Sequence, residues 1–325
     1  MIIVQFLVSA IRFGMTLLFG STGEIITEKS GHLNLGIPGV MCVGASFGCF
    51  AVSKYYDALA KSTAPGELVQ MNGFVAVLLA IVATVIGGML MGLIFSFFTV
   101  TLRANQNVTG LVLTTLGVGI SKFVMTGLSP DSYGVAGKFF GASLPFASKL
   151  GAFGKLFFSY GVLVYLAIVI AIVASLVLNK TRLGLHLRAV GENPATADAA
   201  GINVDAYRYG ATSVGCGISA LGGLTYIMDY LNGNWEYVID SIGWLCVALV
   251  IFSIWRPIFG ILCAIVFSGT YVVASYLELS LAAQEAFRML PYIVTIVVLI
   301  ITSVINKKEN QPPAALGLPY FREER

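Results

Sequence analysis

Polar side chains occur at two places in an otherwise apolar sequence, and their types suit hydrogen bonding to a polar solute. His32 and Asn34 lie in a segment from residue 20 to 39 that is rich in glycine. Asn107, Thr114 and Thr115 interrupt a later apolar run, and helical spacing places Asn107 and Thr114 on one face. Polar residues and broken backbone inside apolar segments are tolerated where they are buried in protein or line a watery cavity. These five side chains therefore predict a solute pathway, with an ordinary turn and simple helix–helix hydrogen bonds as the alternatives.

Residue sets for covalent catalysis, metal binding or ATP binding do not occur in the sequence. The five cysteines lie in apolar runs without a Cys-x-x-Cys pair, and there are only two histidines. No Gly-x4-Gly-Lys-Ser/Thr motif is present, so the chain cannot form a P-loop. We therefore expect no cofactor, no metal and no enzymatic activity.

Charges inside the apolar segments are sparse. Arg12 is the only clear one near a segment centre, and the nearest carboxylates lie at segment ends, namely Glu24, Asp229 and Asp240. Ion-coupled carriers usually need carboxylates or histidines within the bilayer, although sodium sites can use backbone carbonyls. This pattern argues against a secondary carrier.

The composition indicates an all-α, polytopic membrane protein. The 325 residues are 57% hydrophobic and 11% charged, whereas soluble domains carry about 25% charge. The net charge of +3 is too small to indicate a nucleic-acid partner. The 36 glycines include Gly44/Gly48 and Gly88/Gly92, whose small-xxx-small spacing predicts close helix packing.

About nine apolar segments are long enough to be considered as membrane spans. They cover residues 2–22, 34–53, 72–101, 107–127, 158–178, 206–229, 242–255, 257–277 and 289–306. We expect one transmembrane domain over residues 1–306 and a cytoplasmic tail over 307–325 without a fold of its own. The seventh segment is short, and Pro257 separates it from the eighth, so the pair is either a re-entrant hairpin or two full spans.

The stretch of about 25 residues at 180–205 is too polar for lipid and has signals of defined structure. Asn193 is in the position of a helix N-cap, and Pro194 suits the first helical residue. A short helix is predicted from Pro194 to Ala200, and Gly201 would end it in the left-handed conformation. A short capped helix at the water face of a membrane protein is a candidate docking element.

Basic residues predict the orientation in the membrane through the positive-inside rule. The densest basic cluster flanks the polar stretch, which should therefore face the cytoplasm: Lys180, Arg182, Arg188 and Arg208. With nine spans, the N-terminus is then outside and the C-terminus is inside. Further basic residues fall inside on this orientation, namely Lys29, Arg103, Arg256, Lys307 and Lys308. Others fall outside, mostly on longer loops, namely Lys54, Lys61, Lys138, Lys149, Lys155 and Arg288.

Two of these segments resemble a known family of transport proteins. Residues 181–204, with TRLGL, RAVGENP and AGINV, are similar to the cytoplasmic loop of membrane subunits of ABC importers in the branched-chain amino acid/ribose/nucleoside superfamily. Residues 23–39, GEIITEKSGHLNLGIPG, resemble the early motif of the nucleoside and simple-sugar branch. Pro38 stands where many members carry glutamate. The resemblance extends from the first span to about Asn306.

The resemblance implies a permease subunit of an importer in a bacterial plasma membrane. Nucleosides are the expected solute, and a simple sugar such as ribose or galactose is the alternative. The implied partners are a second homologous permease in a heterodimer, an ATP-binding subunit, a lipid-anchored or periplasmic solute-binding protein, and membrane lipid. A stand-alone carrier or channel and a scaffold protein are alternatives of a different class.

The resemblance also gives the short helix a role, as the coupling helix that inserts into a groove on the ATP-binding subunit. Gly191 would let the chain turn, and Glu192 and Asn193 would fix the start of the helix. Arg182 and Arg188 would contact the partner or the lipid headgroups. Pro194 and Gly201 complete the expected coupling set.

Overall fold

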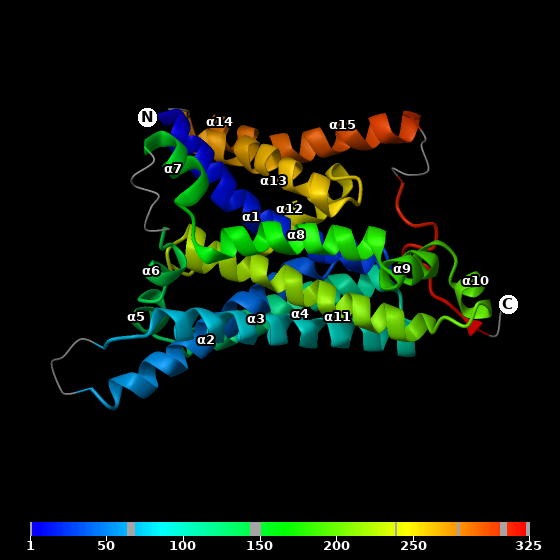
Figure 1. The fold of residues 1–325 in the computed structure, drawn as a ribbon, viewed down its shortest axis with the longest axis horizontal. Coiled ribbons are helices and arrows are strands. Elements are labelled where there is room, and N and C mark those ends of the chain that lie inside the picture. Colours follow the sequence, from blue (N-terminus) through cyan, green and yellow to red (C-terminus); the bar gives the residue numbers. More distant parts are fainter. Residues whose placement is uncertain are drawn as a thin grey trace.

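The computed structural model describes residues 2–63, 69–143, 151–237, 239–277, 280–305 and 311–322. Regular structure in these residues consists of helices without strands, which confirms the predicted all-α fold. The long helices form a bundle with the N-terminus at one end and the C-terminus at the other (Figure 1). We call these the N-terminal end, where α5, α6 and α7 also lie, and the α9–α10 end.

The helices follow one another along the chain with few long connections. They are α1 (Ile2–Glu28), α2 (Ile37–Ala60), α3 (Gly73–Ser96) with a π-helical extension (Phe97–Thr101), α4 (Gln106–Thr126), α5 (Pro130–Gly134), α6 (Gly137–Phe140), α7 (Gly151–Phe158), α8 (Val162–Lys180), α9 (Arg182–Glu192), α10 (Pro194–Ala199), α11 (Val204–Leu224) with a π-helical extension (Thr225–Tyr230), α12 (Ile239–Phe252), α13 (Pro257–Val272) with a 3-10 turn (Val273–Tyr276), α14 (Leu281–Arg288) and α15 (Leu290–Ile305).

Eight helices within the described residues are long and apolar enough to cross a membrane. The predicted count of about nine differs from this by one segment, residues 242–255, which corresponds to α12. α12 has only 14 residues. At 1.5 Å per residue it is about 21 Å long, whereas the hydrocarbon core is about 30 Å thick.

The chain nevertheless passes from one end of the bundle to the other between α11 and α13. Before α12, the Asp229 carboxylate pairs with Arg12 on α1, with Nε and Oδ1 3.3 Å apart. Arg12 thus has a charged partner, which the sequence had placed at the end of another segment. After α12, the Trp255 indole donates to Glu28 at the opposite end of α1. Pro257 then begins α13, as the sequence predicted. Of the two predicted arrangements, this path favours two spans over a re-entrant hairpin.

Glycines let α2, α3 and α11 approach one another closely around Ala220. A Cβ added to Gly44 or to Gly88 would lie 2.5 Å from the Ala220 Cβ, far inside van der Waals contact. At the same place the Thr84 hydroxyl donates to the Gly44 carbonyl at 2.9 Å. This geometry confirms the predicted role of the Gly44/Gly48 and Gly88/Gly92 pairs in helix packing.

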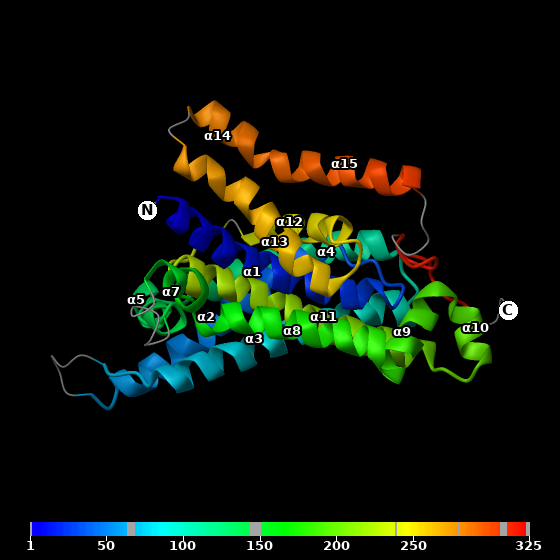
Figure 2. The ribbon, with the colours of Figure 1, turned by 45° about the horizontal axis from the view of Figure 1, so that its top comes forward.

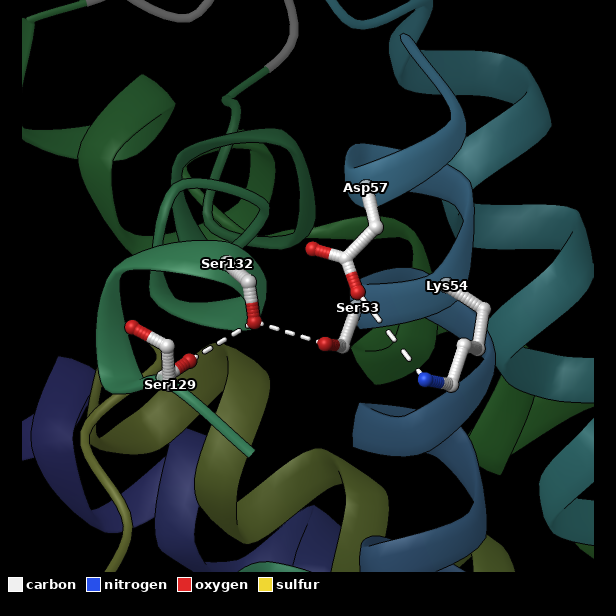
Figure 3. A network of polar contacts seen from close by, with 5 residues as sticks. All are labelled: Ser53, Lys54, Asp57, Ser129 and Ser132. Carbon is white, nitrogen blue, oxygen red and sulfur yellow. Dashed lines mark hydrogen bonds and ion pairs between the residues drawn. The ribbon is translucent and has the colours of Figure 1, made fainter. Parts of the chain in front are cut away.

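At the N-terminal end, the short helix α5 is attached to α2 through serine hydroxyls (Figure 3). Ser132 donates to the Ser129 carbonyl at 2.7 Å, and Ser53 on α2 shares a hydrogen bond of 2.7 Å with Ser132. The nearby Lys54–Asp57 pair is exposed and 4.0 Å apart, so it contributes little to stability. The buried hydroxyls therefore hold this non-spanning segment on the bundle.

Helices α14 and α15 lie at the edge of the bundle beside α12 and α13 (Figure 2). Only 12% of the apolar window in Ala282–Ile301 is buried. Large apolar side chains such as Ile296 and Ile300 are more than half exposed. This face is typical of contact with lipid or with another membrane subunit.

The C-terminal residues differ from the prediction of a tail without structure. Residues 311–322 pack against the α9–α10 end, with Pro313 and Ala315 buried. The prediction is wrong here because the backbone of this segment finds hydrogen-bond partners on two other segments, which its polar composition does not reveal. Residues 306–310 and 323–325 lie outside the described residues, as do Lys149, Lys307 and Lys308.

Candidate functional site

Helix α10 has the capping pattern that the sequence predicted. The Asn193 side chain accepts the Thr196 N–H at 3.0 Å, and Pro194 is the first helical residue. Gly201, at φ +83, reverses the chain after the helix. Ile202 then packs on a small apolar cluster formed by Val190, Ala197 and Val204. The result is a six-residue helix that projects at one end of the bundle (Figure 1).

Gly191 does not form the turn that was expected of it, because it lies in the last turn of α9. Its importance is steric instead. A Cβ at Gly191 would lie 2.3 Å from the Lys29 carbonyl oxygen. The absence of a side chain therefore allows α9 to cross the backbone of the segment that joins α1 to α2, here called the α1–α2 turn (residues 29–36).

The charged residues of α9 differ in exposure. Arg182 and Glu192 are exposed, whereas Arg188 is half-buried and donates to the Gly184 carbonyl at 3.4 Å. Burial lowers the pKa of Lys29, Glu192 opposes this shift, and Arg188 adds to it. The charges of α9 therefore face Lys29 across the contact with the α1–α2 turn.

His32 lies inside the bundle within the α1–α2 turn and is fully buried. Its Nδ1 is 2.9 Å from the Thr212 hydroxyl on α11, and its ring packs edge-on against Phe95. Nε2 is buried without a partner among the described residues. Burial lowers the pKa of His32 well below its usual value, and the Arg208 charge adds to this shift. The imidazole is therefore neutral at physiological pH.

Asn34 is also fully buried and makes three hydrogen bonds. Its N–H donates to Glu24 Oε1 at 3.1 Å, and its side chain donates to Cys216 Sγ at 3.3 Å. Its Oδ1 accepts the Gly36 N–H at 2.9 Å. Cys216 is 12 residues after Val204, the start of α11, which is about 18 Å along the helix. The broken backbone thus lies deep in the bundle and is enclosed by protein, which is the condition for its survival there.

The alternative of an ordinary turn with a solvated Glu28 is wrong, because Glu28 is 3% exposed and accepts the Trp255 indole N–H. Trp255 is one of the polar partners that sequence reasoning missed. Gln106 is another, since it is buried and its Oε1 accepts the Leu33 N–H at 2.8 Å. A signal for Gln106 exists in its spacing from Gly110, Leu113 and Gly117, which form the buried face of α4.

The remaining pathway candidates divide into two groups on α4. Thr114 is half-buried and donates to the Leu35 carbonyl of the α1–α2 turn at 2.9 Å. Asn107 and Thr115 are exposed, and the Thr115 hydroxyl donates to Leu111 one helical turn back. The structure thus brings Thr114 to the turn and leaves Asn107 and Thr115 on an outer face.

No group of three or more His, Cys, Asp or Glu residues that could hold a metal ion occurs in the part of the chain that the structure describes. The side chains gathered around the α1–α2 turn bind one another through hydrogen bonds. These bonds hold the shape of its backbone.

A bundle with eight helices long and apolar enough to cross a membrane, counted in the described residues, is the architecture of a polytopic membrane protein. The chain belongs to the family described as branched-chain amino acid transport system / permease component, whose model matches residues 6–299. This confirms the resemblance found in the sequence.

Three relatives of the chain are named as ABC transporter permease proteins. The chain is 32% identical over 298 residues to the nucleoside ABC transporter permease protein NupC of Lactococcus lactis subsp. cremoris (strain MG1363), covering 88% of each chain. It is 29% identical over 324 residues to the guanosine ABC transporter permease protein NupQ of Bacillus subtilis (strain 168), covering 96% of this chain and 95% of NupQ. It is 30% identical over 257 residues to TsgC13 of Haloferax volcanii, provisionally named a glucose ABC transporter permease protein, covering 77% of this chain and 70% of TsgC13.

A solved structure of a metal-chelate type ABC transporter in an inward-facing conformation aligns with a TM-score of 0.48 and 13% identity, over 93% of this chain and 84% of that chain. That likeness is too distant to bear on the fold.

Family membership makes this chain a transport permease component and not an enzyme, as the sequence predicted. ABC permeases work with an ATP-binding subunit and a solute-binding protein, so these two partners follow from the family.

Proposed function

We propose that this chain is a membrane subunit of an ATP-driven importer of nucleosides in a bacterial plasma membrane. The names of two relatives support the solute class, since NupC is a nucleoside permease and NupQ a guanosine permease. The observation that carries the coupling role is the capped, projecting helix α10, joined through Gly191 to the turn between the first two spans.

In this proposal α10 is the coupling element that inserts into a groove on the ATP-binding subunit. Asn193, Pro194 and Gly201 define where it begins and ends, and Gly191 joins it to the α1–α2 turn. The exposed Arg182 and the half-buried Arg188 would meet the partner or the lipid headgroups. Glu192 would help Asn193 to fix the start of the helix. ATP binding would close the ATP-binding subunit, and α10 would carry this motion into the bundle as a rigid body.

The solute pathway is the second part of the proposal. Asn107 and Thr115 are exposed on α4 and would offer hydrogen bonds to a polar solute passing along that face. His32, Asn34 and Thr114 would act from inside by holding the shape of the α1–α2 turn. Movement of α10, passed on to this turn, would then change the shape of the neighbouring α4 surface.

Orientation and assembly complete the proposal. Lys29 and Arg103 lie at the same end as α9, because the Lys29 backbone meets Gly191 and the Arg103 guanidinium lies over the Phe321 ring. Arg256 is close enough to Lys29 for its charge to lower the Lys29 pKa. This concentration of positive charge supports a cytoplasmic α9–α10 end, with the N-terminus outside and the C-terminus inside. We propose a heterodimer with a second, homologous permease, embedded in lipid and served by a lipid-anchored or periplasmic solute-binding protein.

Replacement of Glu192-Asn193-Pro194 by three glycines tests the coupling role. We expect this variant to insert in the membrane, to lose most association with the ATP-binding subunit and to abolish uptake. A Gly210→Ala variant is the matched control, because a Cβ there meets nothing within 4 Å. Normal uptake by the triple-glycine variant would exclude α10 as the coupling element.

Uptake of radiolabelled uridine, guanosine and ribose, with and without this chain and with and without ATP depletion, tests the solute class. We expect deletion to remove ATP-dependent nucleoside uptake. Loss of ribose uptake alone would favour the sugar importer that the likeness to TsgC13 keeps as a second candidate. Uptake that follows an ion gradient and ignores ATP would favour a secondary carrier.

A further inference from the structure

The residues from 311 to 322 cross the α9–α10 end of the bundle, and we call them the C-terminal strap. They lie beyond residue 299, where the match to the family model ends. In Figure 1 they run beside α9 and end near α10. Their contacts join elements that are far apart in the sequence.

The first contacts of the strap are with α9 and the α1–α2 turn. The Ala315 N–H donates to the Gly191 carbonyl at 3.0 Å, and the Gly317 N–H donates to the Gly31 carbonyl at 3.1 Å. Gly317 has φ +78, a conformation that side chains disfavour. The strap therefore bonds to both sides of the place where Gly191 crosses the turn.

A second set of contacts extends to α4 and α11. The Leu318 carbonyl accepts from Gln106 Nε2 and from Arg208 Nη2, both at 3.4 Å. Gln106 is the same side chain that accepts the Leu33 N–H. Because Gln106 and Arg208 are both buried, these bonds anchor the strap in the bundle and not merely on its surface.

The last contacts are with α10. The Tyr320 hydroxyl donates to Asp198 Oδ2 at 2.7 Å, and Arg322 Nε lies 3.2 Å from the same oxygen. Phe321 packs under the Arg103 guanidinium at 4.9 Å. Tyr320 also packs against the apolar cluster beneath α10. Within the described residues that cluster has three buried members, and the strap adds its own contacts to them.

We propose that the C-terminal strap completes the surface that the ATP-binding subunit meets and holds α10 to the α1–α2 turn, so that the two move as one body. This rests on the proposed function. Without the strap, movement of the ATP-binding subunit would rotate the short helix α10 about the break at Asn193 and would not displace the turn. With the strap, that movement reaches the turn through Gly191, Gly31 and Asp198 together.

Gly317→Pro breaks the strap at one point, because proline lacks the N–H that bonds to Gly31 and cannot adopt φ +78. Leu318→Ala is the matched control, since its side chain is 56% exposed and its carbonyl is unchanged. The whole complex, reconstituted in lipid, is assayed for uptake and ATP hydrolysis. We expect uptake by Gly317→Pro to fall by about tenfold or more. Either the complex continues to hydrolyse ATP without transport, or it loses the ATP-binding subunit. Leu318→Ala should behave as wild type.

Maleimide labelling shows whether the bundle stays folded, because all five cysteines are buried. If Gly317→Pro exposes them, the double variant Tyr320→Phe/Arg322→Gln is assayed instead and judged by the same criteria. It removes the contacts that Tyr320 and Arg322 make with Asp198. If the strap variant transports solute as Leu318→Ala does, with ATP hydrolysis still coupled to uptake, the proposed role of the strap is wrong. If the triple-glycine variant of α10 is inactive in that case, the proposed function stands without the strap. If it is active, the proposed function itself fails.

Discussion

The α1–α2 turn and the α9–α10 segment are both polar interruptions between apolar helices, yet the turn is buried in the bundle and α10 projects from it. The turn is enclosed, with His32 and Asn34 fully buried. Helix α10 projects from the bundle and is capped by its own neighbours in sequence. A polar, glycine-rich segment between spans therefore does not by itself face water or solute.

The difference lies in where the hydrogen-bond partners come from. His32 and Asn34 bond to Thr212 and Cys216, 180 and 182 positions away. The cap of α10 is made by Asn193 and Thr196, three positions apart. Buried polar groups must be satisfied by specific partners, so the turn is held in one conformation, whereas α10 depends on fewer contacts.

Gly191→Val changes the residue at which α9 meets the α1–α2 turn, and it should have the largest effect on stability and uptake. Its side chain would collide with the Lys29 carbonyl, which a Cβ would approach to 2.3 Å. Overpacking of this kind costs about 3 kcal/mol, and separation of α9 from the turn should abolish uptake. Thermal unfolding of the purified protein and an uptake assay measure both effects. Wild-type stability in Gly191→Val would show that the contact is loose, and Gly210→Ala controls for substitution of a helical glycine.

Trp255→Phe removes the donor that satisfies the buried Glu28 at the end of α1. Leaving that carboxylate without its partner should cost about 2 kcal/mol of folding free energy. Trp235→Phe is the control, because its buried Nε1 has no partner among the described residues, so its loss should be neutral. Equal unfolding temperatures for the two variants would mean that Glu28 is satisfied by other groups.

These contrasts also show how far the sequence could lead. The helical class, the span positions and the cap of α10 follow from apolar runs and from residues within one helical turn, so they could be predicted. The burial of Asn34, the steric role of Gly191 and the order in residues 311–322 depend on partners far along the chain. Spacing alone cannot reveal these partners. Gln106 is an intermediate case, because its spacing from Gly110 and Leu113 marks the buried face of α4.

Gln106 and its neighbour Asn107 offer a sharper comparison at adjacent positions. Gln106→Leu removes the acceptor for the Leu33 N–H and should destabilise the protein by about 1 to 2 kcal/mol. Asn107 is exposed, so Asn107→Leu should change the free energy of unfolding by no more than about 0.5 kcal/mol. Solute uptake should fall in this variant, while the complex still assembles. Unfolding and uptake measured on both variants separate the two roles. If Asn107→Leu fails to assemble, Asn107 is a packing residue and not part of the solute pathway.

The smallest expected effect is the dependence of stability on pH through His32. Burial holds its pKa well below the usual value, so the folded protein keeps the ring neutral while the unfolded chain titrates near about 6.5. The stability from this group is therefore complete above that pH and decreases as the pH falls, by at most about 1.4 kcal/mol per pH unit. Unfolding temperatures between neutral and mildly acidic pH should decline less steeply for His32→Gln than for wild type. Identical slopes for these two proteins would mean that a proton can reach the Nε2 side of His32, and the turn would then be open to water and not enclosed.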